Sequence, residues 1–111
     1  MSDTMAVVEA YVVAVGGVPP SALRSPSRVE TVVRWRSVAV YLAHTVFGED
    51  LTTAGGWFHR DRTTAGHMVR RVEEGREGLG DDLLEHLDVG VREFRRALEL
   101  VGRMAPLKAT G

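Results

Sequence analysis

The segment 57–73, WFHRDRTTAGHMVRRVE, holds the polar side chains whose types and spacing are best suited to chemistry. Asp61 is placed to cap a helix, and Arg62, Thr63 and Thr64 would form the first turn of that helix. A first turn that offers Arg and Thr side chains suits the base edges of a DNA major groove, and its free backbone N–H groups suit phosphate oxygens. Small and apolar residues follow at helical spacing: Ala65, Met68, Val69 and Val72. The segment therefore predicts a helix that reads double-stranded DNA.

Other kinds of site find little support in the residues present. The chain contains no G-x-x-x-x-G-K-[ST] motif, and no Ser/His/Asp set stands in the sequence context of a nucleophile. It has no cysteine, and its four histidines show neither H-x-x-x-H nor H-E-x-x-H spacing. We therefore expect no catalytic residues, no metal site and no cofactor, and we predict that the protein is not an enzyme.

Charge is distributed unevenly along the chain. The formal net charge is −1, but residues 24–76 carry nine Arg against six acidic residues. This local excess includes the predicted reading helix and favours a nucleic-acid partner. The chain has thirteen Arg, a single Lys and no Asn or Gln, so the bidentate amide contact to adenine is unavailable. Base reading would depend on Arg, Thr, Ser, His, Asp or Glu.

Length and hydropathy bound the organisation. A chain of 111 residues is expected to form one domain, spanning residues 1–111. No apolar run approaches the 18 residues of a membrane helix, and residues 1–15 carry acids where a signal peptide would carry bases. We therefore expect a cytoplasmic, nucleoid-associated protein with no membrane partner.

Apolar periodicity predicts an all-α fold, a compact domain of about five to six helices. A helix-turn-helix is expected at about residues 50–77, where Asp50 caps a short helix through Trp57 and a tight turn at 58–60 leads into the reading helix, which extends to Glu77. The other expected elements are a first helix ended by Gly16-Gly17, a short turn through Leu23, a loop at 24–28, a long helix at about 29–47 and a C-terminal helix at about 81–104. The residues expected to face inward are Val8, Tyr11, Val12 and Val15 on the first helix, and Val38, Tyr41, Leu42, Thr45 and Val46 on the long one.

The C-terminal helix carries an apolar seam with alternating spacings of three and four residues: Leu84, Leu87, Val91, Phe94, Leu98, Val101 and Ala105. One interpretation is that the whole seam closes the core of the domain. The alternative is that the part beyond Leu98 docks a partner or a second copy. On that alternative, the partner-binding residues would be Leu98, Leu100, Val101 and Met104.

Two stretches resemble the C-terminal double-stranded-DNA-binding domain of the bacterial replication initiator DnaA. The stretch FHRDRTTAGHMVRRVE is similar to the pattern F-G-G-R-D-H-T-T-V-x-H-A-x-R-K-I-E of that family, and RWRSVAVYLAHTVFGEDLTTAGGWF is similar to R-x-R-Q-x-A-M-Y-L-A…L-T-x-x-S-L-x-x-I-G-x-x-F. The resemblance covers roughly residues 7–100. It implies a helical domain with a helix-turn-helix, like that of the Trp repressor.

The resemblance also implies roles for individual residues. Arg28 takes the place of the loop Arg that enters the minor groove, and Arg36 matches the Arg that lies on the DNA backbone. Asp61 could accept from a cytosine amine, and Thr63 could place its methyl group on a thymine. The full expected DNA-binding set is Arg28, Arg34, Arg36, Ser37, Arg60, Asp61, Arg62, Thr63, Thr64, His67 and Arg70. Arg24 is a further cation that could neutralise a phosphate.

Three departures from the family pattern affect DNA recognition. The turn 58–61 is one residue shorter than Phe-Gly-Gly-Arg-Asp, and the loss of the glycine pair removes a left-handed option and could tilt the reading helix. Arg62 replaces a His that helps read the family's DNA site, and Arg prefers guanine. His44 replaces a frequent Lys. We expect the docking mode of the family with a different preferred DNA sequence.

Three functions are compatible with such a domain. The first is a transcription activator of prophage-like or gene transfer agent genes, because the chain resembles the DnaA-like half of split activators whose other half is similar to a sigma factor. The second is a replication modulator that occupies DnaA-type sites without ATPase activity. The third is an interaction module that no longer binds DNA. The partners implied are double-stranded DNA and a sigma-factor-like protein, RNA polymerase or a DNA-bending protein.

Overall fold

The computed structural model describes residues 3–110, and the side chains of residues 4–103. This part of the chain is helical, as expected. Its elements are α1 (Asp3–Gly16), α2 (Pro20–Leu23), α3 (Glu30–Tyr41), the π-helical turn η1 (Leu42–Val46), α4 (Leu51–Trp57), α5 (Arg62–Glu73) and α6 (Asp81–Thr110). None of the described helices is long and apolar enough to cross a membrane.

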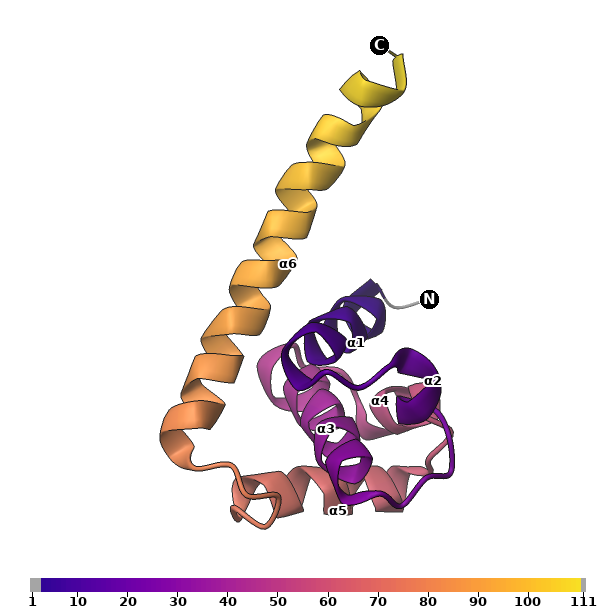
Figure 1. The fold of residues 1–111 in the computed structure, drawn as a ribbon, viewed down its shortest axis with the longest axis vertical. Helices are drawn as coiled ribbons and strands as arrows, with labels where there is room; N and C mark the ends of the chain where they lie inside the picture. Colours follow the sequence, from indigo (N-terminus) through magenta and orange to yellow (C-terminus); the bar gives the residue numbers. More distant parts are fainter. Residues whose placement is uncertain (1–2, 111) are drawn as a thin grey trace.

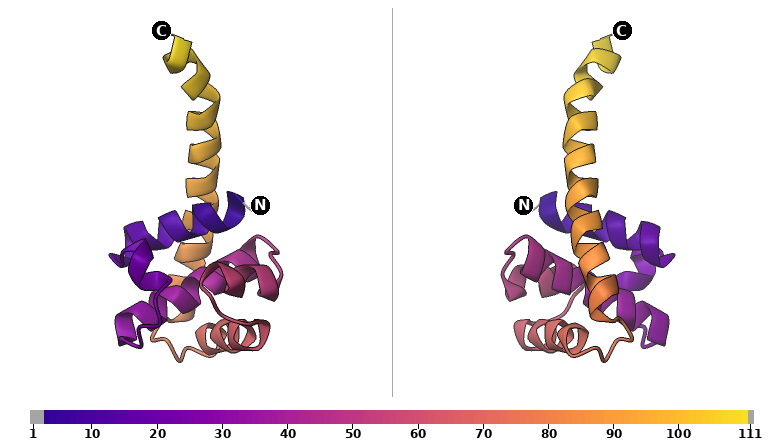
Figure 2. Two further views of the ribbon diagram at one scale, coloured as in Figure 1. Left: turned by 90° about the vertical axis from the view of Figure 1, so that its right-hand side faces the viewer. Right: turned by 90° about the vertical axis from the view of Figure 1, so that its left-hand side faces the viewer.

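The helix α3 lies at the centre of the domain and contacts α1, α2, α4 and α5 (Figure 1). The helix α5, which contains the predicted reading helix, crosses the base of the domain, while α6 runs past α1 and extends far beyond the rest of the chain in all views (Figure 2). The core draws on every α-helix; its largest fully buried side chains include Met5, Val8, Val12, Leu23, Val38, Val40, Leu42, Phe58, Val72 and Val91.

Two inward-facing expectations are wrong. Val15 lies near the end of α1 and is 46% exposed, because its neighbour Gly16 is the residue that packs on Trp35 of α3, and successive residues of a helix point in different directions. Thr45 is exposed because residues 42–46 form a wider π-helical turn, which rotates the end of the long helix relative to a regular α-helix. The turn is closed by the His44 ring, whose Nδ1 lies 2.7 Å from the Glu49 carbonyl oxygen.

The helix α5 ends at Glu73, four residues before the predicted Glu77. Gly75 adopts a φ of 75°, and the N–H groups of Gly75 and Arg76 donate to carbonyls in the last turn of the helix. This left-handed cap satisfies the carbonyls that a helix end leaves free. The chain then turns towards α6, and Glu77 is buried in that connection.

The first half of the apolar seam on α6 is buried against the domain, and the second half is exposed. Leu84, Leu87 and Val91 are buried in the core, and the ring of Phe94 lies 5.8 Å from that of Tyr11 on α1. Beyond Phe94 the helix leaves the domain: Leu98 is 41%, Leu100 48% and Val101 59% exposed. The helix also continues past residue 104 to Thr110, although the side chains of Met104 and Ala105 lie outside the described residues. Only the first half of the seam closes the core.

Candidate nucleic-acid interface

The first turn of α5 has the predicted cap. The Asp61 carboxylate accepts a hydrogen bond of 2.8 Å from the backbone N–H of Thr64, and this bond is the main reason why the pKa of Asp61 lies below its ordinary value. Arg62, Thr63 and Thr64 are all exposed in this turn. The turn therefore presents an ionised carboxylate, a guanidinium and two hydroxyls to solvent.

The turn between α4 and α5 keeps a left-handed residue without a glycine. His59 has a φ of 60°, and the N–H groups of His59 and Arg60 donate to the carbonyls of Gly56 and Gly55 over 3.1 and 2.9 Å. This is the hydrogen-bond pattern of a Schellman cap. The expectation that the short turn loses its left-handed conformation is therefore wrong, because a histidine takes the role of the missing glycine.

Close packing of the helix-turn-helix depends on Gly55. A Cβ atom at this position would lie 2.8 Å from the Ala65 Cβ and 3.0 Å from the Arg60 carbonyl oxygen. The lack of a side chain lets α4 approach the first turns of α5 directly. This contact sets the position of the recognition helix against the body of the domain.

Arg28 lies in the loop before α3, and this loop is held by its own serines. The Ser25 hydroxyl donates to the Ala22 carbonyl over 2.6 Å and accepts from the N–H of Ser27 over 3.2 Å. Arg28 is exposed and makes no hydrogen bond or ion pair with the described residues. It is therefore a free cation on an ordered loop, as a groove contact requires.

Arg36 occupies a different environment from the expected one. It is 4% exposed, and its guanidinium donates to the carbonyls of four residues in the preceding segment, at 2.7–3.4 Å: Ala22, Leu23, Ser25 and Ser27. Burial, and to a lesser degree the nearby charge of Arg60, lowers the pKa of this guanidinium from its ordinary value. A direct phosphate contact does not fit this position, because the side chain is buried and its N–H groups already bind the loop. Ser37 is also buried, at 1% exposure.

Arg60 is likewise held by carbonyl groups. Its guanidinium donates to the Phe58 carbonyl over 2.6 Å and to the Ser25 carbonyl over 2.9 Å. It thereby joins the turn of the helix-turn-helix to the loop that carries Arg28. Sequence reasoning treated Arg60 only as a cation for DNA and missed this link, which connects residues 35 positions apart.

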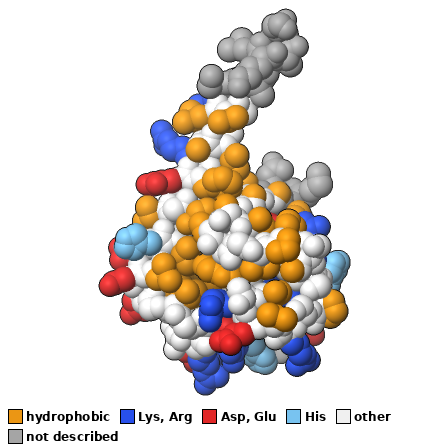
Figure 3. Space-filling view, in the orientation of Figure 1, with side chains coloured by type: hydrophobic (Ala, Val, Ile, Leu, Met, Phe, Trp, Pro, Cys, Tyr) orange, Lys and Arg blue, Asp and Glu red, His pale blue; other side chains and the backbone are white. Residues whose placement is uncertain are grey.

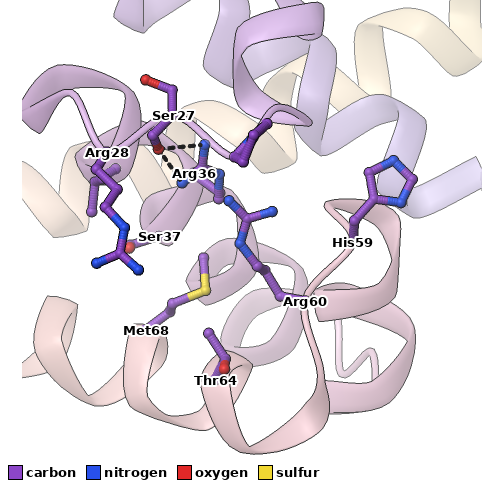
Figure 4. A pocket seen from close by; sticks show the side chains of 10 residues that line it. Ser27, Arg28, Arg36, Ser37, His59, Arg60, Thr64 and Met68 are labelled. Atoms are coloured by element: carbon purple, nitrogen blue, oxygen red, sulfur yellow. Dashed lines mark hydrogen bonds between the residues drawn. The ribbon is translucent and has the colours of Figure 1, made fainter.

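A hollow lies between the loop that carries Arg28 and the helix α5 (Figure 4). Arg28 and Arg60 lie on two of its sides, and Thr64 and Met68 project towards it from α5. Arg36 and Ser37 form part of its inner wall. The loop and α5 thus border one concave surface, which three Arg side chains line.

The remaining predicted cations divide into bound and free groups. Arg34 donates to the Glu77 carbonyl over 2.9 Å and lies 3.5 Å from the Glu30 carboxylate. Arg70 and His67 are exposed on α5, and Arg70 makes no hydrogen bond or ion pair through its side chain with the described residues. Arg34 therefore anchors the connection to α6, whereas Arg70 is available to a ligand.

A cluster that sequence reasoning missed fixes Arg24. Its guanidinium binds both oxygens of the Glu9 carboxylate at 2.7 and 2.9 Å and lies 4.8 Å from the centre of the Trp57 ring. The Trp57 indole N–H donates to the same carboxylate over 3.0 Å. This cluster ties α1, the end of α2 and α4 together, so Arg24 has a structural partner. The local signal was an acid, Glu9, in the middle of an otherwise apolar stretch of the helix.

Comparison with known proteins adds independent evidence. The family model described as "Bacterial dnaA protein helix-turn-helix" matches residues 5–72, which extend from α1 almost to the end of α5. The chain is also 35% identical over 81 residues to the chromosomal replication initiator protein DnaA of Deinococcus deserti. That alignment covers 73% of this chain but only 17% of the relative. The chain therefore belongs to the family of the DNA-binding helix-turn-helix domain of bacterial DnaA.

Proposed function

We propose that this DnaA-type double-stranded-DNA-binding domain is a sequence-specific reader that uses two grooves at once. Arg62, Thr63 and Asp61 contact base edges in the major groove, and Arg28 enters the adjacent minor groove. The observation that carries the proposal is that exposed Arg28 and exposed Thr64, which belongs to the first turn of α5, border the same hollow, while Arg62 and Thr63 are exposed in that same turn. Thr64, His67 and Arg70 then lie near the phosphates that flank the major-groove contact.

The specificity of this reading is tested by two Arg variants that differ in their place on α5. Arg62→Ala should lose roughly 1–3 kcal/mol of binding free energy on the preferred site and little on random duplex DNA, because a base contact carries sequence information. Arg70→Ala should weaken binding to both duplexes about equally, because a phosphate contact does not. The preferred site would be selected from a random duplex pool, and affinities measured at fixed salt. Equal losses for Arg62→Ala on both duplexes would contradict a base-reading role.

We further propose that the protein acts on the nucleoid in the cytoplasm as a transcription activator. One helix-turn-helix contacts few base pairs, so a regulator of this size needs a second source of specificity. The resemblance to DnaA-like halves of split activators favours prophage-like or gene transfer agent genes as targets and a sigma-factor-like protein as the partner.

The distal part of α6 is the surface that we propose for this partner. It extends away from the side of the domain on which α5 lies, so a protein bound there would leave the DNA-binding face free (Figures 1 and 2). Apolar side chains cover the middle of the domain and continue along α6, whereas Arg side chains gather at the base of the domain, where α5 lies (Figure 3). The exposed apolar residues of this surface are Leu98, Leu100 and Val101. We propose that Met104, whose side chain lies outside the described residues, belongs to the same surface.

Charge favours an acidic, amphipathic helix of the partner as the occupant of this surface. Residues 92–103 carry four Arg and two Glu, so a second copy or a basic DNA-bending protein would bring like charges together. The Arg95 side chain is already turned towards the domain, where its guanidinium lies 4.8 Å from the Phe47 ring centre and 3.5 Å from Glu99. The other three, Arg92, Arg96 and Arg103, are exposed and could lie beside an apolar contact between α6 and the partner's helix.

The docking proposal is tested with Val101→Glu and a matched control, Val89→Glu. Both valines are exposed on α6, at 59% and 49%, but Val89 lies on the half of the helix that packs on the domain. Val101→Glu should keep helical content and DNA affinity and abolish activation of a reporter promoter, whereas Val89→Glu should activate normally. Full activation by Val101→Glu would contradict the proposal. Altered sedimentation of the free protein in Val101→Glu would instead identify a second copy as the occupant.

A replication modulator is the alternative, because the relative that the chain matches is a replication initiator. Genome-wide mapping of the bound DNA separates the two functions. An activator should occupy promoters, and its deletion should silence the adjacent genes. Occupancy confined to the replication origin, with altered origin copy number on deletion, would favour the modulator.

A further inference from the structure

We infer that Arg36 and Arg60 form a latch that fixes the loop carrying Arg28 against the helix-turn-helix, so that Arg60 is a positioning residue and acts on DNA only through Arg28. The inference rests on the proposed function, because it explains how the two groove contacts keep a constant separation. It replaces the expectation that Arg36 and Arg60 contact phosphates themselves.

The centre of the latch is the Ser25 carbonyl oxygen. It accepts a hydrogen bond of 2.9 Å from Arg36, which comes from α3, and another of 2.9 Å from Arg60, which comes from the turn. Two guanidinium groups from different elements thus converge on one oxygen of the loop. Hydrogen bonds with a charged donor are stronger than neutral ones, so this oxygen is held firmly.

Both ends of the latch are anchored. Arg60 also donates to the carbonyl of Phe58, whose side chain is completely buried. Arg36 also donates to the Leu23 carbonyl over 2.7 Å, and its Nη1 and Nη2 each lie 3.2 Å from the Ser27 carbonyl oxygen. Ser27 directly precedes Arg28. The backbone just before Arg28 is therefore held by Arg36 of α3 at Ser25 and Ser27, and by Arg60 of the turn at Ser25.

The advantage of such a latch is pre-organisation. A flexible loop loses conformational entropy when its side chain enters a groove, and this loss subtracts from the binding free energy. A loop that is already ordered in the free protein avoids much of it. Arg28 itself keeps no partner among the described residues, so its guanidinium is free while its backbone is held.

The test is a double-mutant cycle on duplex DNA that carries the selected preferred site. Arg28→Ala and Arg60→Ala should each weaken binding, by about tenfold for a contact worth 1.4 kcal/mol. Because Arg60 acts through Arg28, the double variant should bind within about twofold of Arg28→Ala alone. In the Arg28→Ala protein, adding Arg60→Ala should also leave the salt dependence of binding unchanged.

Arg70→Ala is the matched control, since Arg70 is a free cation on the recognition helix. Added to Arg28→Ala, it should multiply the loss and reduce the slope of log affinity against log salt by about 1. The same behaviour from Arg60→Ala would show that Arg60 is a phosphate contact and would overturn the inference. Unchanged affinity in Arg28→Ala would overturn it as well.

Pro26→Gly provides a second route if Arg60→Ala fails to fold, as judged by circular dichroism. This change loosens the loop and leaves both guanidiniums in place. Pro26→Gly should weaken DNA binding of the wild-type protein but should not weaken that of the Arg28→Ala protein further. An equal loss of affinity in both proteins would contradict the latch. If the wild-type protein binds no duplex in a salt-dependent manner, the proposed function fails instead.

Discussion

At the residue scale, the arginines differ in what their guanidinium groups bind rather than in their chemistry. Arg36 and Arg60 bind backbone carbonyls, and Arg24 binds the Glu9 carboxylate. Arg28 and Arg62 are exposed, and their side chains make no hydrogen bond with the described residues. A structural Arg and a DNA-binding Arg can therefore lie a few positions apart in one segment, so each needs its own test.

His59 provides a prediction about stability. A non-glycine residue in the left-handed region costs about 1–2 kcal/mol, and glycine avoids this cost but loses about 0.5–1 kcal/mol of chain entropy. His59→Gly should therefore raise the free energy of unfolding by roughly 0.5–1 kcal/mol in chemical denaturation. Gly48→Ala is the reciprocal control: its φ is 73° and nothing lies within 4 Å of the added Cβ, so it should destabilise the fold through the backbone alone. A destabilised His59→Gly would show that the imidazole makes a compensating contact.

At the element scale, α6 combines a core helix with an exposed extension. Its first half also holds Asp88, whose Oδ1 is buried and has no hydrogen-bond partner in the described structure. Gly90 admits the Tyr11 side chain, since a Cβ there would collide with the Tyr11 hydroxyl. The helices α6 and α1 therefore pack closely at Gly90. The same half of α6 holds a partly buried carboxylate, that of Asp88, whose surroundings disfavour the charged form.

Asp88→Asn tests this junction through pH. Burial is the main cause that raises the pKa of Asp88, with Glu85 adding to the effect and Arg92 opposing it. Because the folded pKa exceeds the unfolded value, ionised Asp88 opposes folding at neutral pH, and the penalty disappears as pH falls below the unfolded value of about 3.9. Asp88→Asn should raise Tm by roughly 2–5 °C at pH 7, and by less at pH 4.

Glu73→Gln, which removes the same charge from an exposed site on α5, is the control for Asp88→Asn. It should change Tm little at either pH. A lower Tm for Asp88→Asn at pH 7 would mean that the carboxylate has a stabilising partner.

At the scale of the whole molecule, a net charge of −1 is compatible with DNA binding because the charges are separated in space. The free cations Arg28, Arg62 and Arg70 belong to the loop and to α5, which border one face, whereas α6 leaves the domain on another side (Figure 1). The sequence offered six arginines besides Arg62 that could neutralise phosphates: Arg24, Arg28, Arg34, Arg36, Arg60 and Arg70. The structure leaves fewer of them free, which lowers the expected salt dependence.

Salt dependence measures this number directly. If each of the three free cations, whether it lies in a groove or on a phosphate, displaces about one counterion from the DNA, log affinity should fall with log salt with a slope of about −2.7, which is roughly a 40-fold loss between 50 and 200 mM. Fluorescence anisotropy on the selected duplex across this range would give the slope. A slope near −5 would mean that the latched arginines also contact DNA, and a flat response would exclude phosphate contacts altogether.

The local sequence determined the helix-turn-helix and its caps. Asp50 and Asp61 accept from the N–H groups of Thr53 and Thr64, as their positions before apolar periodic segments predicted. Such caps join residues three positions apart, so they can be derived from composition and spacing alone. The all-α fold follows from the same local signals, together with the family resemblance.

Only the tertiary structure decided which cations are free. The partners of Arg24, Arg36 and Arg60 lie up to 35 residues away in the chain, and they are carboxylate or carbonyl groups that no sequence spacing indicates. The end of the core part of α6 is also a tertiary result, because the seam continues in register after α1 no longer covers it. Burial depends on what packs against a face, and a periodic pattern specifies the face but not its neighbour.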